Sequence, residues 1–255
     1  MLSSSFLAFS LTIIAGLSTG IGSLIAYFIK EPKFSYLSFL MGFSAGVMIF
    51  VSFVELLNTS IQEIGFLLAN IGFFGGIAGI YLVDKLIPHI HMDTKPDTFH
   101  ETPIHREKLA KVGVLTAIGI AIHNFPEGMA VLAVSLESIS LGIPIAIAIA
   151  VHNIPEGIAV SIPIFYATGD ERKAFSYSFF SGVAEPIGAT IGYLLLLPVL
   201  TETTLNLTLA IVGGIMVFIS FDELLPISKE YGNEHLSSMG LFTGMLIMML
   251  SLSIL

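Results

Sequence analysis

Long apolar runs separated by short polar connections make up most of this chain. About 20 residues of helix cross the hydrocarbon core of a bilayer, so each run predicts one membrane-spanning helix. Strict apolar–polar alternation over about ten residues, the mark of a barrel strand, is not seen. The pattern predicts an all-α, polytopic membrane protein in which residues 1–255 form one domain, an eight-helix bundle. The predicted spans are Ser5–Phe28, Tyr36–Leu57, Ile64–Leu86, Ala110–Val134, Leu141–Ala167, Phe175–Leu197, Leu205–Leu225 and Ser237–Leu255.

The composition agrees with a membrane protein. The chain is 55% hydrophobic and only 11% charged, whereas about a quarter of the residues in a soluble domain are charged. The chain has no cysteine, which excludes disulfides and thiolate metal sites. The first run has no basic stretch before it and exceeds the apolar core of a signal peptide, so we expect it to span the membrane.

The basic residues predict the orientation. All of them lie in or beside the odd-numbered connections, which share one side of the membrane: Lys30, Lys33, Lys85, Lys95, Arg106, Lys108, Lys111, Arg172, Lys173 and Lys229. The other connections carry Glu63, Glu137 and Glu202 and no cation. The positive-inside rule makes the basic side cytoplasmic. With an even number of spans, we expect both termini outside a cell membrane.

The third connection, at about 88–110, is the long one and carries four histidines: His89, His91, His100 and His105. Its polar, proline-containing sequence predicts a mobile cytoplasmic loop. Two interpretations stay open for the histidines. They belong to a solvated linker, or they collect metal ions weakly.

Six carboxylates lie inside the apolar runs: Glu55, Glu127, Glu156, Glu185, Asp222 and Glu223. A charge at the membrane centre costs about 2.5–3.5 kcal/mol on insertion scales, so it normally faces the bundle and has a partner. No lysine or arginine lies in the interior of a span. Either these acids are protonated, or a mobile cation neutralises them, and the second alternative predicts a cation pathway.

Two copies of one motif, HNFPEG at 123–128 and HNIPEG at 152–157, interrupt consecutive spans. In each copy a histidine and a glutamate are four residues apart, which places them on one face of a helix. Imidazole and carboxylate are ligands of zinc and other divalent transition metals. Each proline removes a backbone donor and frees a carbonyl, which is tolerated where it lines a polar cavity. The predicted ligands are His123, Glu127, His152 and Glu156, with amide oxygens from Asn124 and Asn153.

The two motifs are expected to face each other. Each begins near the middle of its span, and consecutive spans run antiparallel. On the sixth span Glu185, followed by Pro186, supplies a bridging ligand or a ligand to a second ion. A single histidine in an apolar helix is more often a hydrogen-bonded core residue, but a repeated motif at matched depth favours metal binding.

The remaining acids have weaker assignments. Glu55 is expected to extend to the membrane interface. Asp222 and Glu223 are either interface charges or part of an exit path. Three pairs of glycines with the spacing of close helix packing are Gly16/Gly20, Gly75/Gly79 and Gly240/Gly244.

The segments HNFPEGMAV and HNIPEGIAVSIPI resemble the ZIP (Zrt/Irt-like) metal transporters, in particular their bacterial ZupT-like branch. The resemblance implies a transporter that takes up zinc, and also iron, manganese, cobalt or cadmium, into the cytoplasm. It implies no prosthetic group and allows a homodimer. By motif, it assigns His123, Glu127, His152 and Glu156 to a first metal position. Asn124, Asn153 and Glu185 belong to a second, with Glu127 and Glu156 shared.

Two functions are alternatives to uptake: an intramembrane zinc metalloenzyme and a divalent-metal exporter. A metalloprotease usually carries H-E-x-x-H, and here asparagine follows the histidine in both motifs. We therefore predict that the chain is not an enzyme. No P-loop motif is present, which argues against ATP as the energy source. The net charge of −9 and the lack of a basic patch outside the connections argue against nucleic-acid binding.

Overall fold

The computed structural model describes residues 2–28, 34–85, 103–196, 201–230 and 234–254. Within these ranges the regular structure is entirely helical, which confirms the predicted fold class. The helices are α1 (Leu2–Tyr27), α2 (Phe34–Val51), α3 (Asn58–Ile64), α4 (Phe66–Asp84), α5 (Pro103–Glu137), α6 (Ile139–Thr168), α7 (Glu171–Leu196), α8 (Glu202–Ile219), α9 (Leu225–Glu230) and α10 (Glu234–Ile254).

Two π-helical segments join some of these helices end to end. Segment η1 (Ser52–Leu57) connects α2 to α3, and η3 (Ser220–Leu224) connects α8 to α9. With these segments included, the described residues form eight continuous helical rods, as the apolar runs predict. Seven of the rods are long and apolar enough to cross a membrane. The eighth, α7, has 26 residues but carries Glu185 and several serines on faces that pack inside the bundle.

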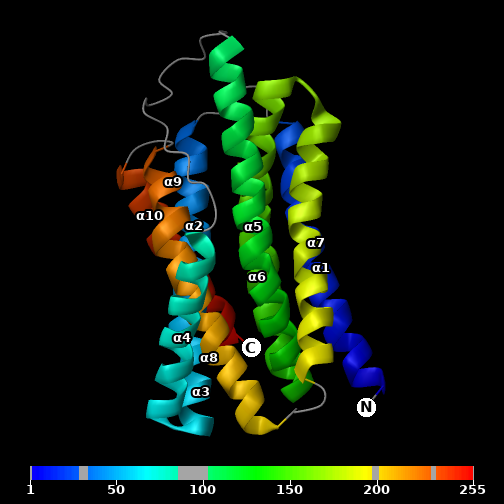
Figure 1. The fold of residues 1–255 in the computed structure, drawn as a ribbon, viewed down its shortest axis with the longest axis vertical. Coiled ribbons are helices and arrows are strands. Elements are labelled where there is room, and N and C mark those ends of the chain that lie inside the picture. Colours follow the sequence, from blue (N-terminus) through cyan, green and yellow to red (C-terminus); the bar gives the residue numbers. More distant parts are fainter. Residues whose placement is uncertain (1, 29–33, 86–102, 197–200, 231–233, 255) are drawn as a thin grey trace.

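The rods form two groups (Figure 1). Helices α1, α5, α6 and α7 pack on one another, while α2, α4, α8 and α10 make up the second group. Contacts of α2 with α6 and of α5 with α8 join the two groups. The residues of both motifs lie in the first group, on α5 and α6.

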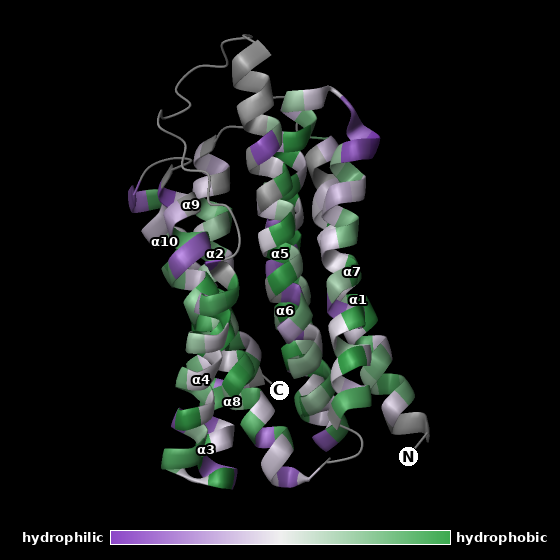
Figure 2. Cartoon of the chain, viewed as in Figure 1, coloured by the Kyte–Doolittle hydropathy of each residue, from purple (hydrophilic) through white to green (hydrophobic). Residues whose placement is uncertain are grey.

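Polar residues gather at the two ends of the bundle (Figure 2). The lysines and arginines whose side chains the structure describes lie near the end of α4, in the first turns of α5 and α7, and on α9. They are Lys85, Lys111, Arg172, Lys173 and Lys229. This part of the bundle, at the top of Figure 1, is called the basic end. Glu63, Glu137 and Glu202 lie at the opposite end. The described cations therefore lie at one end of the bundle, as the sequence predicts.

The third connection differs from its prediction. Helix α5 begins at Pro103, so the last part of the predicted 88–110 loop is helical. His89, His91 and His100 lie outside the described residues, and so does the side chain of His105. The second connection is also shorter than expected, because α3 and α4 meet at Gly65, whose φ of +83° lies in the region that favours glycine.

Two of the three predicted glycine pairs lie at close helix contacts. A Cβ on Gly16 would lie 2.7 Å from the Gly182 carbonyl oxygen, and one on Gly240 would lie 2.1 Å from that of Phe39. The prediction is wrong for Gly75 and Gly79, because nothing in the described structure lies within 4 Å of a Cβ added at either position.

Candidate metal-transport site

The structure places the predicted ligands on three neighbouring helices. Asn124 and Glu127 lie on α5, Glu185 lies on α7, and α6 carries the second motif. The described side chains of this set all have an exposed fraction of 0%: Asn124, Glu127, His152, Asn153, Glu156 and Glu185. His123 lies within α5, but its side chain is outside the described part of the chain.

The glycines of the first motif and of α7 bring α5 and α7 into backbone contact. A Cβ on Gly128 would lie 1.9 Å from the carbonyl oxygen of Glu185, and one on Gly188 would lie 2.0 Å from that of Phe125. Each glycine therefore faces the backbone of the partner helix, and any side chain would separate the helices. This reciprocal contact positions Glu185 next to the HNFPEG motif.

A second reciprocal contact joins α6 to α1. A Cβ on Gly157, the last residue of HNIPEG, would lie 1.9 Å from the Thr19 carbonyl oxygen. A Cβ on Gly22 would lie 2.0 Å from that of Ile154. The motif glycines thus have a definite packing role, since they let α5 and α6 approach their neighbours closely enough for short side chains to meet.

The two motifs contact each other directly. The Nε2 atom of His152 lies 3.1 Å from Oε1 of Glu127, across the α5–α6 contact. The other ring nitrogen, Nδ1, lies 3.2 Å from the Ala148 carbonyl oxygen. A carbonyl oxygen can only accept, so Nδ1 donates to Ala148, and the contact of Nε2 with Glu127 requires a hydrogen on Nε2 or on the carboxyl group. A histidine that ligates metal is normally held in this way by a hydrogen bond from its other nitrogen.

Both asparagines are oriented by backbone carbonyls. Asn124 Nδ2 donates to the Ser181 carbonyl at 3.1 Å. Asn153 Nδ2 donates to the Ala15 carbonyl at 3.0 Å and to Glu185 Oε2 at 2.8 Å. Because the amide nitrogens must face these acceptors, the amide oxygens point elsewhere. Sequence reasoning predicted oxygen donation by both residues, and the observed amide orientations are compatible with it.

Several buried oxygen atoms of the site accept no hydrogen bond within the described structure: Asn124 Oδ1, Asn153 Oδ1, Glu127 Oε2 and Glu185 Oε1. Buried polar atoms are normally paired, so unpaired acceptors point to a missing donor or cation. However, no three histidine, aspartate or glutamate side chains among the described residues are grouped closely enough to hold one ion. The side chains thus meet in pairs, His152 with Glu127 and Asn153 with Glu185.

Comparison with known proteins assigns the family. A family model described as "ZIP Zinc transporter" matches residues 88–252. The chain belongs to this family. It is 51% identical to Zinc transporter ZupT of Streptococcus mutans, with 97% of each chain covered. It is 47% identical to Zinc transporter ZupT of Clostridium perfringens, over 96% of this chain and 95% of the relative. It is 48% identical to the protein of the same name from Campylobacter jejuni, over 98% and 97%. This ZIP-family chain is therefore a multi-pass membrane protein.

Sequence reasoning missed the groups that orient the predicted ligands. Besides the carbonyls of Ala15, Ala148 and Ser181, they include Ser44 on α2, whose Oγ donates to the His152 carbonyl at 3.0 Å. Ser44 belongs to the second helix group, so this hydrogen bond links the two groups at the site. The run AGLSTGIGS on α1, rich in small residues, was the available signal that α1 packs closely against the motifs.

Three of the six acids within the apolar runs lie in the π-helical segments. Glu55 lies in η1, and Asp222 and Glu223 lie in η3. The hexapeptides SFVELL at 52–57 and SFDELL at 220–225 are almost identical, a repeat that sequence reasoning missed. Their serines make matching 2.7 Å hydrogen bonds to the carbonyls four residues earlier. A Cβ on Gly119 of α5 would lie 2.6 Å from Glu223 Oε2, so Glu223 contacts α5 one turn before His123. π-Bulges are frequent at functional sites.

Proposed function

We propose that this chain transports zinc ions across the membrane through the buried side chains of α5, α6 and α7. One observation carries the proposal. The three glutamates Glu127, Glu156 and Glu185 are fully buried, while no lysine or arginine is buried among the described residues. Burying ionised carboxylates costs several kcal/mol each, and a divalent cation offsets that cost. The relatives, each named a zinc transporter, support the same substrate.

The donor set suits zinc in two adjacent positions. His123, Glu127, His152 and Glu156 form the first position, and Asn124, Asn153 and Glu185 form the second, with Glu127 and Glu156 shared. Two divalent ions carry four positive charges and offset the charge of the three carboxylates, whereas one ion carries only two. Nitrogen and oxygen donors also suit Fe²⁺, Mn²⁺, Co²⁺ and Cd²⁺, whereas Cu⁺ prefers sulfur.

The chain's own groups prepare the site for an ion. Ala148 holds His152 with Nε2 directed at Glu127. The Ser181 and Ala15 carbonyls fix the asparagine amides. Ligands that are already oriented lose less rotamer entropy when an ion binds. The His152–Glu127 and Asn153–Glu185 contacts separate as ions enter between them. Glu223, next to Gly119, supplies a carboxylate on the route toward the basic end.

The test is zinc uptake into liposomes that contain the purified protein. Glu127→Gln removes a site charge with almost no change in shape, and Glu137→Gln is its matched control. Both glutamates lie on α5, but Glu137 is exposed at the end of the helix. We expect Glu127→Gln and His152→Ala to lose transport, and Glu137→Gln to retain it. Uptake by Glu127→Gln equal to that of the control would refute the proposed route. Iron and manganese as competitors would rank the metals.

The proposal also includes a direction, inward to a cytoplasm at the basic end of a cell-membrane protein. The absence of cysteine from the chain makes this orientation testable with single introduced thiols. Lys173→Cys and Glu137→Cys place a thiol at opposite ends of the bundle. A membrane-impermeant maleimide added to intact cells is expected to label position 137 and not position 173. The reverse result would place the basic end outside and contradict the proposed orientation.

A further inference from the structure

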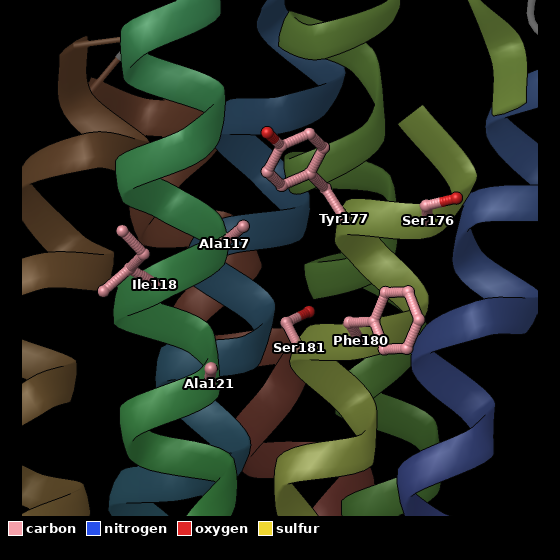
Figure 3. Close-up of a pocket in the computed structure, with 7 residues that line it drawn as sticks. All are labelled: Ala117, Ile118, Ala121, Ser176, Tyr177, Phe180 and Ser181. Atoms are coloured by element: carbon pink, nitrogen blue, oxygen red, sulfur yellow. The ribbon is translucent and has the colours of Figure 1, made fainter. Parts of the chain in front are cut away.

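A groove opens between α5 and α7 in the half of the bundle nearer the basic end (Figure 3). It encloses about 310 Å³. Its floor is buried, with exposed fractions of 5% for Ala117 and 3% for Ser181. Its rims are exposed, 43% for Ile118 on α5 and 68% for Phe180 on α7. The groove is thus open on the outer face of the bundle and closed toward its interior.

The position of the groove determines what surrounds it. The apolar span of α5 begins at Thr116, so Ala117 and Ile118 lie in its first turn, where the outer face of the bundle meets lipid. Apart from hydroxyl groups, the lining consists of aliphatic and aromatic groups. A flexible apolar chain fits these surroundings better than a polar solute does.

Each wall of the groove carries a lysine at the same spacing. Lys111 precedes Ile118 by seven residues on α5, and Lys173 precedes Phe180 by seven residues on α7. Seven residues are two helical turns, about 10 Å, and return to the same face. Both lysines are exposed. The groove is therefore flanked, at its end nearer the membrane surface, by one cation from each wall.

Two acids, Asp170 and Glu171, lie beside Lys173 at the start of α7. Asp170 Oδ1 accepts hydrogen bonds from the backbone N–H groups of Arg172 and Lys173, at 3.0 and 3.1 Å. Lys111, Arg172 and Lys173 are exposed at this end of the bundle. These three cations outnumber the two acids by one.

We propose that this groove binds an anionic phospholipid of the leaflet at the basic end. One acyl chain lies between Ile118 and Phe180, and the phosphate lies between Lys111 and Lys173. Basic pockets between membrane helices recognise anionic headgroups in this way. The Tyr177 hydroxyl points toward the same end of the groove (Figure 3). Ser181 on the floor also accepts the hydrogen bond from Asn124, so the bound lipid lies directly behind a side chain of the candidate metal site.

The chain has no tryptophan, so one introduced indole can report lipid binding by fluorescence quenching. The full-length Phe180→Trp variant is placed in phosphatidylcholine liposomes with small fractions of brominated phosphatidylglycerol or brominated phosphatidylcholine. The control is Phe74→Trp on α4, which is 62% exposed and lies at a similar distance along its helix from the basic end. Each lysine near the membrane surface is expected to favour an anionic lipid about fivefold. We therefore expect brominated phosphatidylglycerol to quench Phe180→Trp at a lipid fraction at least tenfold lower than brominated phosphatidylcholine requires. At Phe74→Trp the two lipids should quench equally.

Three results would overturn the proposal. The first is equal quenching by the two brominated lipids at position 180. The second is an anionic preference that persists after Lys111→Gln and Lys173→Gln are introduced together into Phe180→Trp. The third is loss of the preference on addition of inorganic phosphate at constant ionic strength, which would identify a phosphate site instead of a lipid site. The proposal is supported if the preference for brominated phosphatidylglycerol is lost when both lysines are replaced and is kept when inorganic phosphate is added.

Discussion

Replacing Gly128 by alanine tests the link between helix packing and the metal site. The added Cβ would lie 1.9 Å from the Glu185 carbonyl oxygen, whereas ordinary contact begins at 3.4 Å, so α5 and α7 must separate by about 1.5 Å. Overpacking of this kind costs about 1–3 kcal/mol. Functional side chains must be held within about 0.5 Å of their productive positions. A separation about three times that tolerance is expected to impair zinc binding as well as folding.

The matched control is the same substitution at Gly79 of α4, where nothing in the described structure lies within 4 Å of the new methyl group. There alanine is expected to leave stability unchanged or to raise it by up to about 1 kcal/mol, because it favours the helix more than glycine does. The two variants differ only in whether a neighbouring backbone occupies the space of the Cβ.

The assays are thermal unfolding of the purified protein in detergent and zinc uptake into liposomes. Gly128→Ala is expected to unfold at a lower temperature and, where it remains folded, to bind zinc about 10- to 100-fold more weakly, the usual effect of disturbing groups that support metal ligands. Gly79→Ala should behave like the wild type in both assays. A Gly128→Ala protein with unchanged unfolding temperature and zinc affinity would show that the α5–α7 contact does not position the site.

Three further substitutions separate individual contacts. Asn153→Asp places a carboxylate 2.8 Å from Glu185 Oε2 and should destabilise the metal-free protein by about 1–3 kcal/mol. Added zinc should recover part of this loss in a thermal scan, and equal stability with and without zinc would contradict the reasoning. Ser44→Ala removes the hydrogen bond to the His152 carbonyl and should cost about 1 kcal/mol, again measured by thermal unfolding, where an unchanged midpoint would count against it. Thr201→Ala removes the capping box of α8 and should cost about 1 kcal/mol while the zinc concentration for half-maximal uptake stays the same.

Much of the architecture could be predicted from the sequence because membrane insertion depends on local hydrophobicity. A run of apolar residues long enough to cross the bilayer must be helical, since its backbone groups have no other hydrogen-bond partners in lipid. The eight rods of the described residues follow from that constraint, and the position of the described lysines and arginines at one end follows the positive-inside rule. The helix boundaries were predicted less accurately than the number of helices. Helix α5 begins at Pro103, inside the predicted loop, because a polar amphipathic segment can extend a helix beyond the membrane without a hydrophobic signal.

The chemistry of the site was also visible in the sequence. Histidine and glutamate four residues apart, repeated in consecutive spans, have few structural uses in an apolar helix. Most of the groups that orient the predicted ligands were not visible. Ala15, Ala148 and Ser181 act through backbone carbonyls, which every residue has, so no residue type marks them. Ser44 lies 108 positions from the histidine whose carbonyl it contacts.

The sequence by itself determined that this protein is a helical membrane bundle with buried metal-type ligands, because burial cost and ligand chemistry are properties of individual side chains. Only the tertiary structure decided which ligands meet. His152 faces Glu127, Asn153 faces Glu185, and Gly128 and Gly157 contact carbonyls on different helices. Gly75 and Gly79 have the same four-residue spacing as Gly240 and Gly244 and yet lie in open space. Helix packing depends on the shape of both partners at once, and a single helix sequence contains only one of them.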